Sequence, residues 1–343
     1  MRFLKFKFII GVSIGIYIIG MLASNASADG VNLGVYPPII QIIATPPAKI
    51  ESEVTIQNLE NQSINVSIEL RPFTASKKEN GEVRYLNKNE PFGADPLLLQ
   101  RIEIVENGKI IKETVLGPKQ KKTLKINITI PKESPLSDYY FSILFISKSY
   151  QYDQISQSEK EPKQSGSFMQ VGISTNILLS VGPKGIAKGT IEEFSSPLFM
   201  EKGPVPFTVR INNKSEHSVA PKGNILIKNF FGQLIGNIEL AQVNILAGTI
   251  RSIPDIEHII NLKTQKEMLS MDHPKAFWTE YFLLGPYTAT LTTSLTDNGP
   301  IYSRTIYFFG FPIQGVIGIL MSVIIVFWLK QRINYHKKNK PNT

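Results

Sequence analysis

Hydrophobic and polar residues alternate with a period of two along much of this chain, a pattern that predicts β-strands. It is clearest in residues 53–57 and 64–70, on either side of Asn58–Ser63, where it predicts a pair of strands with one face on a core. The same alternation fills Lys121–Ile130 and residues 205–211. No stretch before the apolar segment near the C-terminus has the period of an amphipathic helix.

Turn-forming residues divide this pattern into short segments. Asn107-Gly108 predicts a tight hairpin between 102–105 and 109–115, because both residues accept the left-handed backbone of a two-residue turn. Pro37-Pro38 splits Val31–Ile43 into two extended pieces, and proline has no N–H to donate, so we expect this segment at a sheet edge. Further strands are predicted at Tyr139–Ile146, Gln170–Val181, Asn224–Lys228, a segment ending at Leu240, Ile245–Ile256, Tyr287–Leu291 and Ile301–Tyr307.

Many short strands without helices between them are typical of antiparallel β-sandwiches. We therefore predict an all-β ectodomain of two tandem immunoglobulin-like antiparallel β-sandwiches, residues 29–183 and 184–306, joined at Gly182–Gly185. Residues 205–228 repeat the order of residues 53–70: an alternating strand, a turn rich in Asn and Ser, and a second strand. This repetition suggests that the two sandwiches share one architecture.

An apolar run, Phe308–Leu329, follows the last predicted strand almost directly. About 22 residues at 1.5 Å each cover roughly 30 Å, the hydrocarbon thickness of a bilayer. We predict one C-terminal transmembrane α-helix at 307–329, the alternative being a buried core helix. Residues 330–343 are basic without an acidic residue, which predicts a cytoplasmic tail.

The first residues of the chain have the features of a signal peptide. Three basic residues within the first seven positions precede an apolar run, which ends in the small residues Ala26-Ser27-Ala28. We predict a signal peptide at 1–28 and a mature start at Asp29. An uncleaved segment would form a second membrane helix and leave the following residues on the same, outer side.

The formal charge of +9 suggests a nucleic-acid ligand, but its distribution argues against one. Of the 37 basic residues, three lie in the signal peptide and five in the tail, which leaves 29 against all 28 acidic residues. The predicted ectodomain is therefore nearly neutral, and we expect no nucleic-acid partner. Cysteine is absent, so no disulfide holds this exported part together and its core must do so.

Few residues carry candidate chemistry. The three histidines of the ectodomain, His217, His258 and His273, lie far apart, and no cysteine or Gly-x-Ser-x-Gly turn supplies a nucleophile. We expect His217 to be solvated in a turn. Asp272-His273 could give two metal ligands, but no second pair of ligands lies nearby.

Glu192-Glu193 is the one adjacent carboxylate pair that suggests a glycosidase, whose two acids face each other across a cleft. Adjacent residues of a regular strand point to opposite faces, so this pair cannot do so by itself. We therefore predict no catalytic, metal or cofactor-binding residues and no cofactor.

Two surface features leave alternatives open. The segment Ser147–Gly166 is rich in Gln, Ser, Lys and Glu, and it is either a loop that engages a partner or a solvated connection. The aromatic residues Phe277, Trp278, Tyr281 and Phe282 either stack on sugar rings or fill the core and rest near the bilayer.

Residues 35–70, VYPPIIQIIATPPAKIESEVTIQNLENQSINVSIEL, resemble the first domain of bacterial surface proteins with two immunoglobulin-like domains and a C-terminal membrane helix. The resemblance is to the WxL-interacting cell-surface proteins of Gram-positive bacteria. In these, an extended strand precedes a Pro-Gly turn, a strand that ends in Asn and then its partner; Pro46-Pro47 and Gln57-Asn58 take these places. The layout of the first domain also resembles periplasmic pilus chaperones.

A second segment matches the same proteins through Ala247-Gly248, Arg251 and Gly285-Pro286-Tyr287. Pro47 and Ala247 depart from the expected Pro-Gly pairs. The resemblance implies attachment at the cell envelope and binding of a surface protein or of a cell-wall polymer.

Two functions remain open. The first is a non-enzymatic, single-pass membrane protein at the cell surface, which binds an envelope partner by strand addition or by a loop. The second is a hydrolase acting on cell-wall polymer, which would need carboxylates brought together by the fold.

Overall fold

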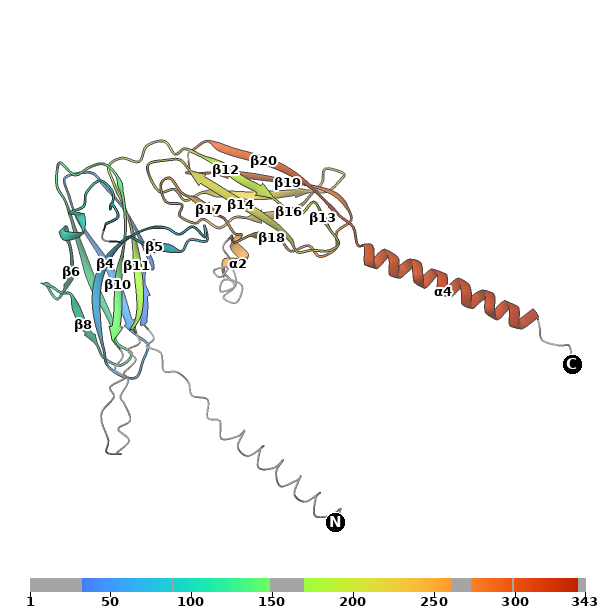
Figure 1. The fold of residues 1–343 in the computed structure, drawn as a ribbon, viewed down its shortest axis with the longest axis horizontal. Coiled ribbons are helices and arrows are strands. Elements are labelled where there is room, and N and C mark those ends of the chain that lie inside the picture. Colours follow the sequence, from blue (N-terminus) through green and yellow to red (C-terminus); the bar gives the residue numbers. More distant parts are fainter. Residues whose placement is uncertain (1–32, 88, 149–169, 261–272, 298, 339–343) are drawn as a thin grey trace, which may run out of the picture.

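The computed structural model describes residues 33–87, 89–148, 170–260, 273–297 and 299–338. Three features of the sequence analysis lie outside the described residues: the predicted signal peptide, the polar loop from residue 149 onward, and Asp272. Within it the chain forms two β-sandwiches and one long helix, arranged as an L from whose second arm the helix leaves (Figure 1). The all-β class and the tandem immunoglobulin-like layout are as predicted.

The first sandwich packs two sheets over one core. Its strands are β1 (Leu33–Tyr36), β2 (Ile39–Ala44), β3 (Ala48–Asn58), β4 (Ile64–Ala75), β5 (Val83–Tyr85), β6 (Ile102–Glu106), β7 (Lys109–Ile110), β8 (Glu113–Leu116), β9 (Lys121–Ile130), β10 (Asp138–Lys148) and β11 (Gln170–Val181), with a 3₁₀ turn at Leu98–Arg101. One sheet has the order β1-β3-β9-β6-β7; the other has the order β2-β11-β10-β4-β5, with β8 also pairing with β4. Alternate residues of β9 from Leu124 to Ile130 are buried in the core between the sheets, as their period of two predicts.

The second sandwich repeats this construction. Its elements are β12 (Gly189–Ser195), β13 (Phe199–Met200), β14 (Val205–Asn213), β15 (Lys222–Lys228), β16 (Leu234–Glu239), β17 (Ile250–Ser252), α2 (Ile256–Ile260), β18 (Ala276–Trp278), β19 (Gly285–Ser294) and β20 (Ile301–Gly310). One sheet is β12-β14-β17, with β18 paired to β14, and the other is β13-β20-β19-β15-β16. A separate apolar core fills the space between them.

The predicted edge segment is confirmed, and the predicted hairpin is confirmed only near its turn: its second strand ends at Ile110, and residues 113–116 form β8, which pairs with β4 in the other sheet. β1 and β2 lie at the edges of the two different sheets, and Pro37-Pro38 forms the crossing between them. β6 pairs with β7 around Asn107-Gly108, whose φ angles of 52° and 77° are those of the expected left-handed turn.

The predicted pairing of residues 53–57 with 64–70 is wrong. Both segments form strands, but β3 and β4 lie in opposite sheets. The buried side chain of Asn58 holds the crossing between them: its Nδ2 donates to the carbonyl oxygens of Gln62 at 2.7 Å and Gly117 at 2.8 Å. Two strands with alternating hydrophobic residues each bury one face, whether they pair within one sheet or lie in opposite sheets across the core. Periodicity alone therefore does not distinguish pairing within a sheet from packing between sheets.

The predicted membrane helix begins later in the structure. Phe308 pairs with Tyr287 in the β19–β20 ladder and is buried in the core, so residues 307–310 belong to β20. The helix α4 (Ile313–Lys338) follows Pro312, which suits the residue just before a first helical turn. An apolar run of three or four residues is compatible with a buried strand and with a membrane helix. The predicted start of the helix, at residue 307, was therefore too early.

Candidate binding site

The two sandwiches touch through a small apolar contact. Phe73 and Leu178 lie on the outer face of the β4–β10–β11 sheet, and Leu246 of the second sandwich covers them. Tyr140 on β10 stacks on Phe73 with ring centroids 6.2 Å apart, and its hydroxyl accepts a hydrogen bond from the N–H of Ala247 at 3.1 Å. An outer sheet face that would otherwise meet water is therefore used to join the sandwiches.

The turn between β4 and β5 forms a polar clamp on one side of this contact. Glu79 accepts two hydrogen bonds of 2.7 Å from the guanidinium of Arg210 on β14, and its backbone carbonyl accepts a third, of 3.0 Å, from Ser252. The ion pair is largely shielded, with the two side chains 25% and 14% exposed. A forked, shielded pair of this kind fixes orientation as well as position.

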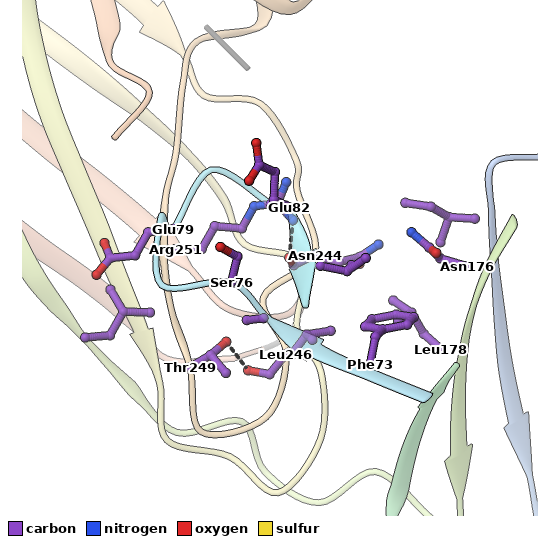
Figure 2. A pocket seen from close by; sticks show the side chains of 15 residues that line it. Phe73, Ser76, Glu79, Glu82, Asn176, Leu178, Asn244, Leu246, Thr249 and Arg251 are labelled. Atoms are coloured by element: carbon purple, nitrogen blue, oxygen red, sulfur yellow. Dashed lines mark hydrogen bonds between the residues drawn. The ribbon is translucent and has the colours of Figure 1, made fainter. Parts of the chain in front are cut away.

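A crevice opens beside this clamp (Figure 2). Arg251 crosses it and donates to the carbonyl oxygen of Asn244, while its Nε is buried without a partner among the described residues. Burial lowers the pKa of Arg251 to about 10, so the side chain keeps its charge at neutral pH. A Cβ at Gly81 would lie 2.1 Å from Nη2 of Arg251, so this glycine makes the approach possible.

The crevice holds only about 60 Å³. This volume is far below the roughly 300–1,000 Å³ of ligand pockets. Its residues thus belong to the junction and do not form a binding site for a sugar or peptide.

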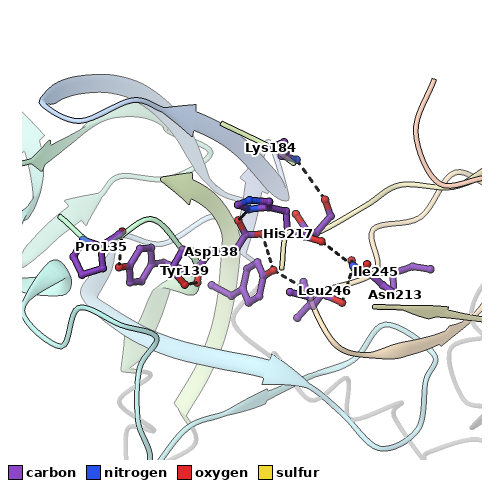
Figure 3. Close-up of polar contacts among 12 residues, drawn as sticks. Pro135, Asp138, Tyr139, Lys184, Asn213, His217, Ile245 and Leu246 are labelled. Atoms are coloured by element: carbon purple, nitrogen blue, oxygen red, sulfur yellow. Dashed lines mark hydrogen bonds and ion pairs between the residues drawn. The ribbon is translucent and has the colours of Figure 1, made fainter. Parts of the chain in front are cut away.

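A second polar cluster lies on the other side of the apolar contact (Figure 3). Asp138, at the start of β10, is 2.7 Å from Nδ1 of His217 and accepts a 2.7 Å hydrogen bond from the N–H of Ser218. It also accepts a 2.7 Å bond from the hydroxyl of Tyr140. Burial would raise the pKa of Asp138, but the bonds from His217 and Ser218 outweigh it and hold the pKa below its ordinary value.

The expectation that His217 is solvated is therefore wrong. Its side chain is 15% exposed, and it leaves the turn after β14 to meet Asp138 of the first sandwich. The sequence did not predict this contact because it joins residues 79 positions apart, and no local pattern indicates such a pair.

The other two histidines lie elsewhere. His258 of α2 contacts Asp255 at 2.7 Å and packs on Phe277. His273 is half exposed, with Nδ1 3.6 Å from Glu79. Among the residues described by the structure, no three His, Asp or Glu side chains gather as a metal site would require.

Glu192 and Glu193 share one face of the sheet, contrary to the alternation argument. Glu192 accepts from Asn212 at 3.3 Å and Glu193 from Arg210 at 3.2 Å, and these two partners are alternate residues of β14. A β-bulge between Ile191 and Glu193 causes this, because the extra residue breaks the alternation. Both carboxylates are bound to neighbouring side chains rather than directed across a cleft.

The aromatic residues near 280 divide into two groups. Trp278 is buried in the second core, where it meets Tyr287 and Phe308 edge to face, and Phe277 is half-buried on His258. Tyr281 and Phe282 are exposed.

An open groove lies on the first sandwich, beside the junction. With a volume of about 430 Å³ it falls within the range of ligand pockets. The end of β4, β5, the following loop and the start of β10 form its walls, with residues Phe73, Thr74, Arg84, Leu86, Glu90, Pro91, Phe92, Gly93, Asp138, Tyr139 and Tyr140.

The groove combines an apolar wall with a charged pair. Phe92 meets Tyr139 edge to face at 5.8 Å, and burial raises the pKa of the Tyr139 hydroxyl to about 12. Across from them, Nη1 of Arg84 donates to both carboxylate oxygens of Glu90, at 3.0 and 2.8 Å, and this holds the pKa of Glu90 below its usual value. No sequence motif marked this groove, because its residues come from three separate segments.

Residues 41–146 match the family model of the WxL Interacting Protein, peptidoglycan binding domain. The match covers most of the first sandwich and none of the second. It confirms the resemblance drawn from residues 35–70. Every residue that lines the open groove falls within the matched range.

Pilus chaperones are among the solved structures that this chain resembles. The class 5 fimbriae chaperone CfaA has a TM-score of 0.36 at 8% identity and covers 81% of this chain and 99% of its own. The Escherichia coli chaperone DraB has a TM-score of 0.33 at 10% identity, covering 80% and 96%, and CupB2 of Pseudomonas aeruginosa 0.31 at 8%, covering 78% and 97%. No curated protein matches the sequence.

Proposed function

We propose that this chain is an exported, membrane-anchored protein that binds peptidoglycan-type cell-wall polymer in the open groove of its first sandwich. The observation that carries the proposal is the coincidence of the groove with residues 41–146, the range that matches a peptidoglycan-binding family model. The earlier prediction of a surface-protein partner stays a prediction.

The anchor in this proposal is α4. Within the described residues, Ile313–Arg332 is the one helix long and apolar enough to cross a bilayer, and it is not covered by protein. Lys330 and Arg332 follow the apolar run, and basic residues favour the cytoplasmic side, which supports an outer location for both sandwiches. Arg332 lies over the Trp328 ring at 5.3 Å, a pairing suited to the interface between hydrocarbon and water.

The groove offers two kinds of contact to such a polymer. Cell-wall glycans carry acidic peptide stems, and an arginine takes a carboxylate through parallel N–H donors. Both bonds from Arg84 to Glu90 use Nη1, so Nη2 and Nε make no contact with described residues and are free for a ligand carboxylate. Phe92 and Leu86 provide apolar surface for the body of the ligand.

The acidic side chains of the groove favour binding over hydrolysis. A glycoside hydrolase needs one carboxyl group whose pKa is raised, so that it holds a proton to donate. The pKa values of Glu90 and Asp138 are both lowered, by Arg84 in the first case and by the contacts of the junction in the second. Each therefore stays ionised at neutral pH and has no proton to donate to a leaving group.

The test is co-sedimentation of the full chain, in detergent, with insoluble purified peptidoglycan. We expect Arg84→Ala to weaken retention by roughly tenfold or more, since a hydrogen bond to a charged group contributes about 1.5–3 kcal/mol. Phe92→Ala should weaken it as well. Arg71→Ala is the matched control, because Arg71 forms a similar exposed pair with Glu69 at 2.7 Å, outside the groove.

Equal retention of the wild-type protein and of both groove variants would contradict the groove as the site. Absence of retention by the wild-type protein would contradict the function. Release of soluble wall fragments during the incubation would favour the hydrolase instead.

A further inference from the structure

The second sandwich has two ends, and they face different surroundings. At one end the turn after β14 and the residues around Leu246 meet the first sandwich. The opposite end is defined by the β19–β20 register, where Gly285 pairs with Gly310. α4 leaves from this opposite end (Figure 1).

The link between this end and the helix is short. β20 ends at Gly310 and α4 begins at Ile313, and three residue steps span at most about 10 Å. The candidate span Ile313–Arg332 has 20 residues, about 30 Å of helix, and it already includes Lys330 and Arg332, so no apolar length is left over after the hydrocarbon layer is crossed. If α4 spans a bilayer, Gly310 therefore lies at the level of the lipid headgroups.

Large apolar side chains cover this same end. Phe230 and Phe231 form the tip of the β15–β16 turn, near the start of β19, because Lys228 pairs with Thr288. Phe231 is 80% exposed, and the side chain of Asn229 braces the turn by accepting from the N–H groups of Phe231 and Gln233 at 3.0 Å. The two phenyl rings are thus displayed on a fixed turn rather than folded inward.

The loop that enters β19 adds a second group. Tyr281, Phe282 and Leu284 are all exposed, and Phe282 is 61% exposed. The loop is held in place, since the carbonyl of Tyr281 accepts from the N–H of Gly203 at 3.0 Å. Phe309, which stacks on Phe199 at the end of β20, completes a surface that borders the helix entry. We name Phe230, Phe231, Tyr281, Phe282, Leu284 and Phe309 the apolar rim.

We propose that the apolar rim rests in the headgroup and upper acyl layer of the bilayer that holds α4, so that the second sandwich stands on the membrane surface. Aromatic side chains favour this layer, and exposed large apolar side chains gathered at one end of a domain mark a docking site. The proposal rests on the anchor assigned under the proposed function.

The charges around the rim indicate the kind of lipid. Lys202 lies over the Tyr281 ring at 5.7 Å, and Lys228 is exposed beside the β15–β16 turn. Glu201 adjoins Lys202 and Glu280 adjoins Tyr281, and their negative charges offset the positive charges of the two lysines. We therefore expect apolar insertion to hold the rim in place without anionic lipid.

The chain contains no cysteine, so single cysteine variants of the full protein can carry a spin label at one chosen position. The test uses Phe231→Cys and Phe282→Cys in phosphatidylcholine nanodiscs, with collisional accessibility to oxygen and to a water-soluble nickel complex as the readout. Ile301→Cys is the matched control, because Ile301 is 73% exposed at the end of β20 away from the membrane. Ser322→Cys, in the middle of α4, reports on the anchor.

We expect the oxygen-to-nickel accessibility ratio at positions 231 and 282 to exceed that at 301 several-fold and to fall below that at 322. Ratios at 231 and 282 equal to that at 301, with a high ratio at 322, would overturn the rim and leave the anchor standing. A water-like ratio at 322 would overturn the anchor and the rim together.

Discussion

Asn58 and Asn213 perform the same task in the two sandwiches, and the chain uses the resulting turns differently. Each residue ends a strand, is fully buried, and holds the crossing to the opposite sheet through its side chain. Asn58 donates to Gln62 and Gly117, while Asn213 donates to His217 at 2.8 Å and Ile245 at 3.1 Å. The two turns therefore have the same construction.

The difference lies in what each turn presents. The turn after Asn58 is exposed, whereas the turn after Asn213 carries His217 and Ser218 to Asp138 of the first sandwich. A shared architecture therefore leaves each copy free to take its own role. In the account proposed here the first sandwich keeps an open groove, and the second joins the first at one end and the membrane at the other.

The largest expected effect comes from removing the shared asparagines. Asn58→Ala and Asn213→Ala each leave several buried carbonyl and N–H groups without a partner, so we expect a loss of about 3 kcal/mol or more in the free energy of unfolding. Differential scanning calorimetry of the full chain should show each variant lowering the transition of its own sandwich. Asn237→Ala, which removes an exposed pair with Asn224, is the control.

A smaller effect is expected at the clamp. Arg210→Ala leaves Glu79 shielded without its forked partner, which should weaken the junction by about 2–3 kcal/mol without unfolding either sandwich. The distribution of distances between spin labels on the two sandwiches, measured by pulsed electron paramagnetic resonance, should broaden. An unchanged distance distribution would show that the contacts around Leu246 and Asp138 fix the junction without the clamp.

The contribution of Asp138 to the junction should depend on pH. Its folded-state pKa is lowered from an ordinary value of 3.8, so its stabilising effect is complete above that value and is lost as the pH falls through the folded-state pKa. The groups that face Asp138 are His217, Ser218, Ser180 and Tyr140. We expect the distance distribution to broaden below about pH 4 in the wild type, and Asp138→Asn to show the broad distribution already at pH 7. Identical pH profiles for both proteins would contradict this role.

The smallest effect is expected on the exposed face of the first sandwich. Lys125 and Glu51 form a pair at 2.6 Å with both side chains about half exposed. Solvent screens such pairs, so Lys125→Ala should leave the unfolding temperature unchanged within the error of the measurement. A clear decrease would mean that exposed pairs contribute more to this sandwich than the comparison with Arg210 assumes.

Local patterns predicted most of the strands because a period of two reports which face of a strand is buried. The Asn107-Gly108 hairpin and the edge position of residues 33–44 followed from backbone chemistry at single residues. The pairing of β3 was not predictable in this way, since Asn58 reaches a carbonyl 59 positions away.

The groove and the junction lay beyond local reasoning for the same reason. Phe73, Arg84 and Tyr140 come from different segments, and only the fold brings them to one surface. The bulge that turns Glu192 and Glu193 to one face also has no signal in the sequence around it. The resemblance of residues 35–70 implied binding of a surface protein or of a cell-wall polymer, although it did not indicate which surface binds.

The most direct test of wall binding by the first sandwich is amide hydrogen exchange of the full chain, with and without soluble peptidoglycan fragments. We expect slower exchange in residues 83–87, 89–93 and 138–140, which line or flank the groove, and no change in β14–β20. Protection confined to the second sandwich, at a fragment concentration that saturates binding, would contradict the account.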